Sequence, residues 1–281
     1  MESICHTVHQ PHLEKITEIP VERKDIHRGH LILVNREHHI QLTQQELDLL
    51  PVKGIQASEE FKRNMYLERV CLQQLTALLH KCQALDKIAA VSGYRSSTEQ
   101  RQLYEDSLRE NGEVFTSNYV ARPNESEHQT GLAVDVGESS DEIDFIRPSF
   151  PDRGACKIFK QLAADYGFIQ RYKEGKEHIT NIANEPWHFR YVGFPHAVII
   201  EQLDLCLEEY ICFLKQYRFG QEHLYFKHGS DMIEIYYVPA RDSATIIPVT
   251  NRKRYNLSGT NEGGFIVTVF HEKGSGHCGI Q

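Results

Sequence analysis

Two short segments place the strongest constraint on how this chain folds. The first is the string SEHQTGLAVD at residues 126–135, and the second is EPWH at residues 185–188. Together they contain two imidazoles and three carboxylates. Three protein ligands with an open fourth position form a catalytic zinc site, whereas a structural zinc site fills all four positions with protein. We therefore expect the fold to bring the segments together so that one zinc ion is held by His128, Asp135 and His188.

Local sequence indicates how each segment is built. Proline disfavours helical geometry at the residue before it, so Glu185 and His188 are not expected on one helix face. We expect them at the start of a strand, with Glu185 reaching the fourth zinc position from a bend. A carboxylate placed there is a general base for metal-assisted hydrolysis. Gly131 and the β-branched residues after it favour a turn followed by a strand, with His128 before the strand and Asp135 on it.

Each segment alone is weak evidence for a metal. The chain contains 16 histidines and 39 acidic residues, so a histidine and an aspartate seven positions apart also arise without function. The EPWH string is equally typical of a strand with a tryptophan in the core. Trp187 is the only tryptophan, and the sequence leaves open whether it packs in the core or beside the metal.

Composition excludes several classes of protein. Hydrophobic residues make up 40% and charged residues 25% of the 281 positions, which is an ordinary globular composition. The net charge of −8 argues against a nucleic-acid partner or an anionic membrane surface. We expect no membrane span, because no segment has the roughly 20 apolar residues of one. The N-terminus lacks the apolar region of a signal peptide, and the 7 scattered cysteines indicate reduced thiols, so we expect a cytoplasmic protein.

Apolar periodicity predicts an order of helices and strands. Helices are expected over residues 58–82, from about Ser97 to 111–112, over 156–166 and over 196–216. Strands are expected over 31–35, 88–91, 132–136, 168–172, 187–192, 233–238, 245–249 and 265–270, with a loop over 113–127.

Longer strings resemble the zinc D-Ala-D-Ala peptidases of the VanX, VanY and VanXY type. The pattern Ser-x-His-x-x-Gly-x-Ala-x-Asp matches residues 126–135, and the string EPWHFRYVG matches residues 185–193. A third string, SGYRS, matches residues 92–96, and Gln100 stands where the family often has a glutamine. The resemblance covers about residues 29–200. Asn124 and Asn181 depart from positions that are commonly glycine in the family, which puts the shape of the pocket rim in doubt but touches no expected ligand.

The resemblance implies a role for each matching residue. His128, Asp135 and His188 would bind one zinc ion per chain, and Glu185 would move the proton. Arg95 would stabilise the charge that develops on the carbonyl oxygen. The substrate would be bound by Ser126 and Gln100, although Ser126 also fits a simple cap on the turn before His128.

The resemblance also implies a fold and an activity. We expect an α+β domain over residues 27–217, in which a small, mainly antiparallel sheet carries the zinc between flanking helices. A lead-in over 1–26, a small β-rich module over 218–272 and a disordered tail over 273–281 complete the expected division. The implied activity is hydrolysis of D-Ala-D-Ala, of the C-terminal D-Ala of peptidoglycan-precursor pentapeptides, or of both, in support of glycopeptide (vancomycin) resistance. The sequence does not predict the oligomeric state.

Two other interpretations stay open at this point. One is an L-Ala-D-Glu peptidoglycan endopeptidase on the same scaffold, which the extra C-terminal module favours. The other is a non-catalytic zinc-fold binding protein, against which the presence of both Glu185 and Arg95 speaks.

Overall fold

The structure, a computed structural model, describes residues 3–8 (as backbone), 16–53, 65–140, 144, 146–250 and 254–271. The chain divides into two compact units, and each is described by itself. One unit spans residues 34–208, and the other combines residues 1–33 with residues 209–281.

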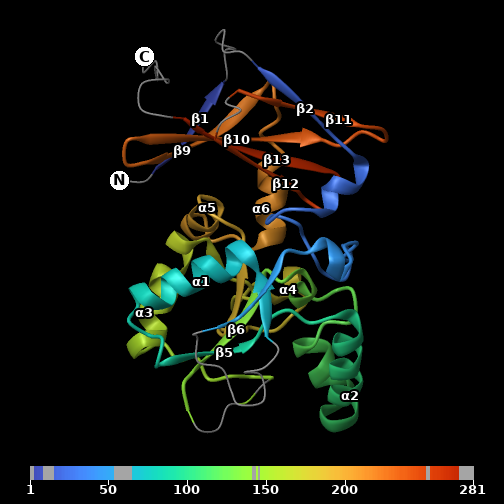
Figure 1. The fold of residues 1–281 in the computed structure, drawn as a ribbon, viewed down its shortest axis with the longest axis vertical. Helices are drawn as coiled ribbons and strands as arrows, with labels where there is room; N and C mark the ends of the chain where they lie inside the picture. Colours follow the sequence, from blue (N-terminus) through green and yellow to red (C-terminus); the bar gives the residue numbers. More distant parts are fainter. Residues whose placement is uncertain are drawn as a thin grey trace. The chain divides into compact units, whose positions relative to one another are not determined.

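A four-stranded antiparallel sheet forms the centre of the 34–208 unit (Figure 1). Its strands, in sheet order, are β5 (Ile88–Ser92), β6 (Ala133–Glu138), β8 (His188–Tyr191) and β7 (Phe168–Gln170). Nearly every residue of these strands is buried, which explains why they appear in the sequence as short apolar runs. The expected α+β fold with a small antiparallel sheet is confirmed.

Helix α1 (Arg69–Lys81) begins later than the periodicity suggested. The Glu68 carboxylate accepts hydrogen bonds from the backbone N–H groups of Val70 and Cys71, and this cap sets the helix start. The preceding residues form strand β4 (Tyr66–Glu68), paired with β3 (Leu49–Pro51). The start expected at residue 58 lies outside the described residues.

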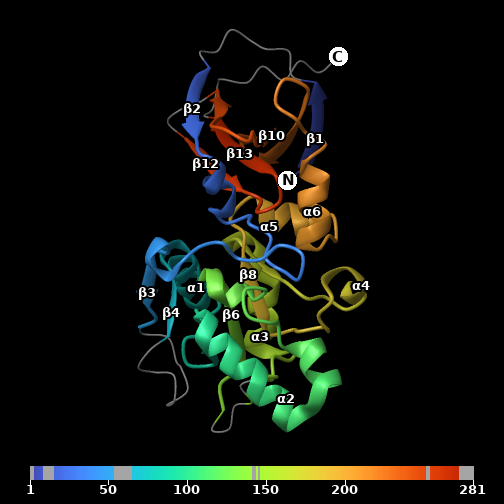
Figure 2. The ribbon, with the colours of Figure 1, turned by 90° about the vertical axis from the view of Figure 1, so that its right-hand side faces the viewer.

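Helix α2 (Ser97–Tyr119) continues beyond the expected stop at residues 111–112, and the chain changes direction within it (Figure 2). Ser96 and Glu99 form a capping box at its start. Gly112, with φ of +79°, interrupts the helix but does not end it. The two parts are tied by a 2.8 Å hydrogen bond between the buried hydroxyls of Ser107 and Thr116. The loop expected over 113–127 is therefore wrong as far as Tyr119.

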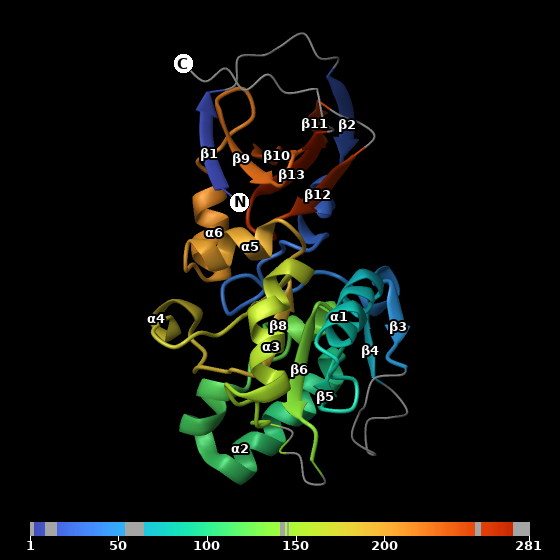
Figure 3. The ribbon, with the colours of Figure 1, turned by 90° about the vertical axis from the view of Figure 1, so that its left-hand side faces the viewer.

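The remaining helices of this region are shorter. Helix α3 (Gly154–Leu162) and a following 3-10 turn, η4 (Ala163–Tyr166), match the helix expected over 156–166 and lie against the sheet (Figure 3). The helix expected over 196–216 is wrong as a single element, because the chain is interrupted at Asp204, whose φ is +49°. Helix α5 (His196–Gln202) belongs to this unit, whereas most of α6 (Leu207–Leu214) belongs to the other unit. Three short turns complete the region: η2 (Gln44–Glu46), η3 (Glu127–Thr130) and α4 (Glu177–Thr180).

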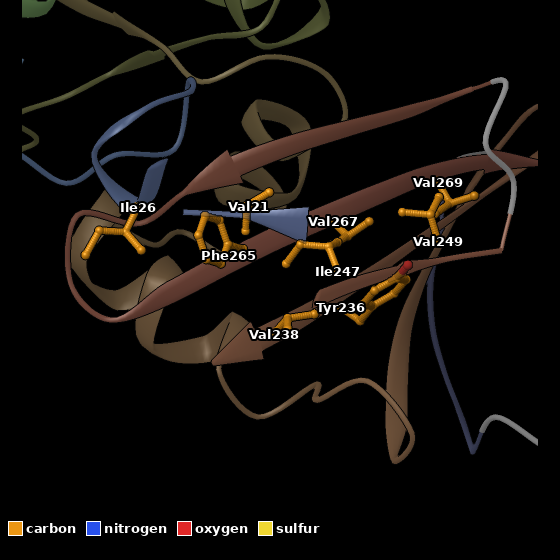
Figure 4. Packing of buried hydrophobic residues seen from close by; sticks show 9 residues of the cluster. All are labelled: Val21, Ile26, Tyr236, Val238, Ile247, Val249, Phe265, Val267 and Val269. Atoms are coloured by element: carbon orange, nitrogen blue, oxygen red, sulfur yellow. The ribbon is translucent and has the colours of Figure 1, made fainter. Parts of the chain in front are cut away.

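The second unit consists largely of strands. A five-stranded antiparallel sheet has the order β1 (Ser3–Val8), β9 (Glu222–His228), β10 (Asp231–Pro239), β13 (Gly264–His271) and β12 (Tyr255–Gly259). A two-stranded sheet pairs β2 (Thr17–Val21) with β11 (Thr245–Val249). A hydrophobic cluster of Ile26 and residues from β2, β10, β11 and β13 forms a core in this unit (Figure 4). The expected β-rich character of this region is confirmed.

The described parts of the N-terminal segment 1–26 differ from the loose lead-in that the sequence suggested. Strand β1 pairs with β9, β2 pairs with β11, and Val21 and Ile26 join the hydrophobic cluster (Figure 4). The run 31–35 is likewise irregular and not a strand, although Leu31 to Val34 are buried. Their partners lie more than two hundred positions away in sequence, for instance Leu33 with Thr260, so local periodicity carries no signal of them. The two compact units divide at 33/34 and 208/209, whereas the boundaries predicted from sequence are 26/27 and 217/218. The expected tail 273–281 lies outside the described residues.

No helix among the described residues is long and apolar enough to cross a membrane. Five cysteines of the described residues form no disulfide, and four of them are buried.

Candidate metal centre and active site

The register of the central sheet brings two of the expected zinc ligands together. Asp135 on β6 is the direct cross-strand partner of His188 on β8. His128 lies in the 3-10 turn η3, just before β6. One ligand atom from each of the three residues lies within 4.8 Å of the others, and all three residues are buried.

Gly131 makes the turn that carries His128 back onto the strand. Its φ is +72°, a left-handed conformation that glycine adopts at little cost. A Cβ at this position would lie 2.7 Å from Leu49 Cδ2 and 3.0 Å from the Glu68 backbone nitrogen. The glycine of the sequence string is thus required both by backbone conformation and by space.

The Asp135 carboxylate lies between the two imidazole rings. Oδ2 is 3.1 Å from His128 Nε2, and Oδ1 is 3.0 Å from His188 Nδ1. The buried Oδ1 has no well-formed hydrogen bond to any described residue. Two imidazole nitrogens and one carboxylate oxygen are a donor set suited to zinc. The residues present therefore fit a metal ion held by three protein ligands.

The electrostatics of the cluster favour a bound cation. Burial raises the pKa of Asp135, but the two histidine rings outweigh it and hold that pKa well below its usual range. Burial lowers the pKa of His188, but Asp135 and Glu127 outweigh it and raise that pKa to about 10. In His128 burial prevails and the pKa is lowered. The carboxylates of Asp135 and Glu127 therefore stabilise a positive charge at the position of the His188 ring.

Glu185 lies beside these residues on the bend before β8. Its backbone N–H donates to the Tyr172 carbonyl at 3.0 Å, and its Oε2 is 3.7 Å from His188 Nδ1. Burial raises the pKa of Glu185 to about 8, and the negative charges of Asp135 and Glu127 act in the same direction. A dication held by the three candidate ligands would lower the pKa of the neighbouring Glu185 carboxyl.

Arg95 lies on the loop after β5 and is held by one side chain of β5 and one of α2. Its Nη1 donates to Gln100 Oε1 at 2.7 Å, and its Nη2 donates to Ser92 Oγ at 2.8 Å. Gln100 also donates from Nε2 to the Ala121 carbonyl at 2.6 Å and is buried. The Gln100 amide thus binds Arg95 and the backbone, so its geometry supports a role in orienting the guanidinium more than the expected contact with substrate.

One cavity of about 60 Å³ gathers all seven residues that the sequence singled out. Ser126 lines it, is buried, and makes no side-chain cap hydrogen bond to the following turn, so the capping alternative gains no support. Trp187 is buried and also lines the cavity, which answers the question that the sequence left open.

The sequence interpretation missed two residues of the site, Glu127 and Tyr172. The Tyr172 ring lies 4.9 Å from the His188 ring and lines the cavity. Glu127 is completely buried, and its Oε1 accepts hydrogen bonds from Arg171 and Arg190, each at 2.8 Å. The sequence did contain a signal of this carboxylate. Arg171 and Arg190 lie in segments expected to be strands, and an arginine buried in a strand requires an acidic partner.

Three comparisons with known proteins agree with this geometry. The family model "VanY: D-alanyl-D-alanine carboxypeptidase" matches residues 64–194, which include all three candidate ligands and Glu185. The chain is 41% identical over 189 residues to the bifunctional D-Ala-D-Ala dipeptidase and D-Ala-D-Ala carboxypeptidase VanXYC of Enterococcus gallinarum, covering 66% of this chain and 95% of that relative.

Two solved structures are similar. The vancomycin resistance D,D-dipeptidase VanXYg, in complex with a D-Ala-D-Ala phosphinate analog, is 43% identical with a TM-score of 0.85, over 92% of this chain and 100% of that one. A VanY D,D-pentapeptidase mutant from a VanB-type resistance cassette, in complex with Zn(II), is 29% identical with a TM-score of 0.51, over 65% and 98%. This chain therefore belongs to the VanY family of D-alanyl-D-alanine carboxypeptidases.

Proposed function

We propose that this protein is a zinc-dependent D,D-peptidase that hydrolyses peptides ending in D-alanine. The observation that carries the proposal is the buried cluster of His128, Asp135 and His188 with Glu185 beside it. Membership of the family and the names of the similar proteins support the D,D-specificity.

Three residues would hold one zinc ion per chain. His128 offers Nε2, His188 offers Nδ1, and Asp135 offers its carboxylate. Zinc bound in this way supplies a water of pKa about 7 and polarises the scissile carbonyl. The solved relative with Zn(II) supports the choice of metal.

Glu185 and Arg95 would perform the chemistry of the protein itself. Glu185, close to His188 Nδ1, is placed to take a proton from the attacking water and to deliver it to the leaving amine. Arg95 donates hydrogen bonds from Nη1 to Gln100 and from Nη2 to Ser92, which hold its guanidinium in place. It would stabilise negative charge on the carbonyl oxygen. Both side chains line the same cavity, so the two roles are spatially compatible.

The cavity walls would bind the C-terminal D-alanine. Ser126 offers a hydroxyl to the substrate backbone or carboxylate, and Trp187 and Tyr172 offer apolar surface. Such a site takes a free D-Ala-D-Ala dipeptide, the end of a pentapeptide precursor, or both. Activity of this kind removes the terminus that glycopeptide antibiotics recognise, and this is the proposed link to vancomycin resistance.

The test is an assay of D-alanine release from D-Ala-D-Ala and from the pentapeptide precursor, side by side, with Glu185→Gln as the inactive variant. We expect turnover of at least one substrate and a loss of about 10²–10⁴-fold in kcat in the variant. Glu174→Gln, at an exposed acid on the nearby loop, is the matched control.

Two outcomes would overturn the proposal. Cleavage between L-Ala and D-Glu in muropeptides would identify the endopeptidase alternative instead. Binding of substrate by zinc-loaded protein without any turnover would identify a non-catalytic binding protein.

A further inference from the structure

The two histidines of the candidate metal centre face it with different ring nitrogens. His128 turns Nε2 toward Asp135, while its Nδ1 is 2.7 Å from the Gly93 carbonyl oxygen. His188 turns Nδ1 toward Asp135. A neutral imidazole has one proton, so a ring that offers Nδ1 to a metal keeps its proton on Nε2. The Nε2–H of His188 therefore requires an acceptor inside the protein.

Glu127 is the acceptor within reach. Its Oε2 lies 3.6 Å from His188 Nε2, and each of these two buried atoms lacks a hydrogen-bond partner among the described residues. We propose that Glu127 is a positioning residue, whose carboxylate receives the Nε2–H of His188 and so holds Nδ1 toward the metal. This inference rests on the metal site of the proposed function.

A buried ion network fixes the far side of the Glu127 carboxylate. Oε1 accepts from Arg171 Nε and Arg190 Nη1, and Arg171 also makes two hydrogen bonds of 2.9 and 2.7 Å to Glu208. Two arginines and two glutamates balance in charge, so no buried charge is left without a counterion. Because both arginines only donate, they fix the role of Oε1 and direct Oε2 at His188.

Substitution by glutamine reverses one hydrogen bond without changing the size of the side chain. In Glu127→Gln the amide oxygen must face Arg171 and Arg190, because an NH₂ group there would oppose two donors. The NH₂ group then faces His188 Nε2, where it cannot accept a proton. The variant therefore favours the His188 tautomer with the proton on Nδ1, which does not bind a metal. Loss of such an outer partner costs about 10–100-fold in metal affinity.

Glu208→Gln is the matched control. This substitution removes one negative charge from the same ion network, at a carboxylate that also binds Arg171. Glu208 is not one of the three candidate ligands and does not line the cavity. The zinc dissociation constant of wild type and of both variants is measured by competition with a chromogenic chelator. We expect Glu127→Gln to bind zinc about 10–100-fold more weakly than Glu208→Gln, which stays near wild type.

A second measurement needs no variant to fold. Nitrogen-15 NMR of the histidine rings in zinc-loaded wild type is expected to show His188 with its proton on Nε2, and His128 with its proton on Nδ1. A zinc affinity of Glu127→Gln equal to that of Glu208→Gln would overturn the inference, as would a His188 ring without a proton on Nε2. Failure of the wild type itself to bind zinc is a different result, because it contradicts the proposed metal site and with it this inference.

Discussion

Asp135 and His188 are directly opposite each other on strands β6 and β8, and their side chains meet with Oδ1 and Nδ1 3.0 Å apart. Strand register alone therefore joins two segments that are distant in sequence. The third candidate ligand, His128, needs only the turn at Gly131 to reach the same place.

Replacement of the central carboxylate is expected to abolish tight metal binding. Asp135→Asn keeps the shape of the side chain but removes the negative charge that lies between His128 and His188. Loss of a group that only hydrogen-bonds a ligand lowers metal affinity by about 10–100-fold. We expect a larger loss of zinc affinity here, because the substituted residue is itself a candidate ligand. Equilibrium dialysis with zinc measures the effect, and Asp152→Asn, at an exposed acid, is the control. Unchanged zinc content in Asp135→Asn would contradict the ligand assignment.

Arginine is expected to be required at position 95, and lysine is not expected to replace it. The Arg95 guanidinium donates from different nitrogens to Gln100 and Ser92, a fork that lysine does not reproduce. We expect Arg95→Lys to lower kcat by about 10²–10³-fold while zinc affinity stays close to wild type. Gln100→Ala, which removes one anchor of the arginine, should lower kcat by a smaller factor. A larger loss in Gln100→Ala than in Arg95→Lys would show that Gln100 contacts the substrate itself.

A methyl group at Gly131 is expected to destabilise the 34–208 unit and to weaken metal binding. Gly131→Ala meets a left-handed φ and also a close contact with the Glu68 backbone. Gly175→Ala, where φ is +84° and no atom lies within 4 Å of the added Cβ, meets the first penalty alone. Backbone strain of this kind costs about 1–3 kcal/mol. We expect the melting temperature of Gly131→Ala to be clearly below that of Gly175→Ala, and equal values would contradict the contact argument.

A buried carboxylate in the second unit predicts sensitivity to acid. Glu234 accepts hydrogen bonds from His223 at 2.6 Å and His271 at 2.9 Å. Burial raises its pKa, but these two partners outweigh burial and lower that pKa below the ordinary value of 4.5. A carboxyl whose folded pKa is lowered stabilises the fold fully above its unfolded pKa, and this stabilisation is lost as the pH falls.

The prediction is that acid protection of this sheet depends on Glu234. After correction for the intrinsic effect of pH on exchange, the amide hydrogen exchange of β10 and β13 should quicken as the pH falls below about 4.5. Glu234→Gln should flatten this dependence. Equal slopes in wild type and variant would refute the role of this carboxylate.

The local elements of the site were predictable from sequence, and the reasons are physical. Strand β6 and the strand that carries His188 are apolar runs next to turn signals, so both the turn at Gly131 and the bend at Pro186 are local properties. The residue types suggested the candidate ligand set, and the resemblance to a family strengthened it. The roles of Arg95 and Ser126 did not, because only the resemblance to a family singled them out.

Interactions between distant residues were not predictable. Strand β2 is stabilised by β11, and the Glu127 carboxylate by Arg171 and Arg190, none of which is a sequence neighbour. The expectation that Gln100 binds substrate came from the resemblance to a family. Its contact with Arg95 depends on the path of α2 beside the loop after β5, which the sequence does not report. Such pairings are set by tertiary packing, which periodicity in a single sequence does not report.

The most direct test of the central claim is D-alanine release from D-Ala-D-Ala and from pentapeptide precursor by the same protein sample before and after metal removal. The account predicts that chelator-treated protein is inactive, that one equivalent of zinc per chain restores turnover, and that zinc does not restore Asp135→Asn. Full turnover by protein shown to be free of metal, or no turnover by protein with one bound zinc, would contradict it.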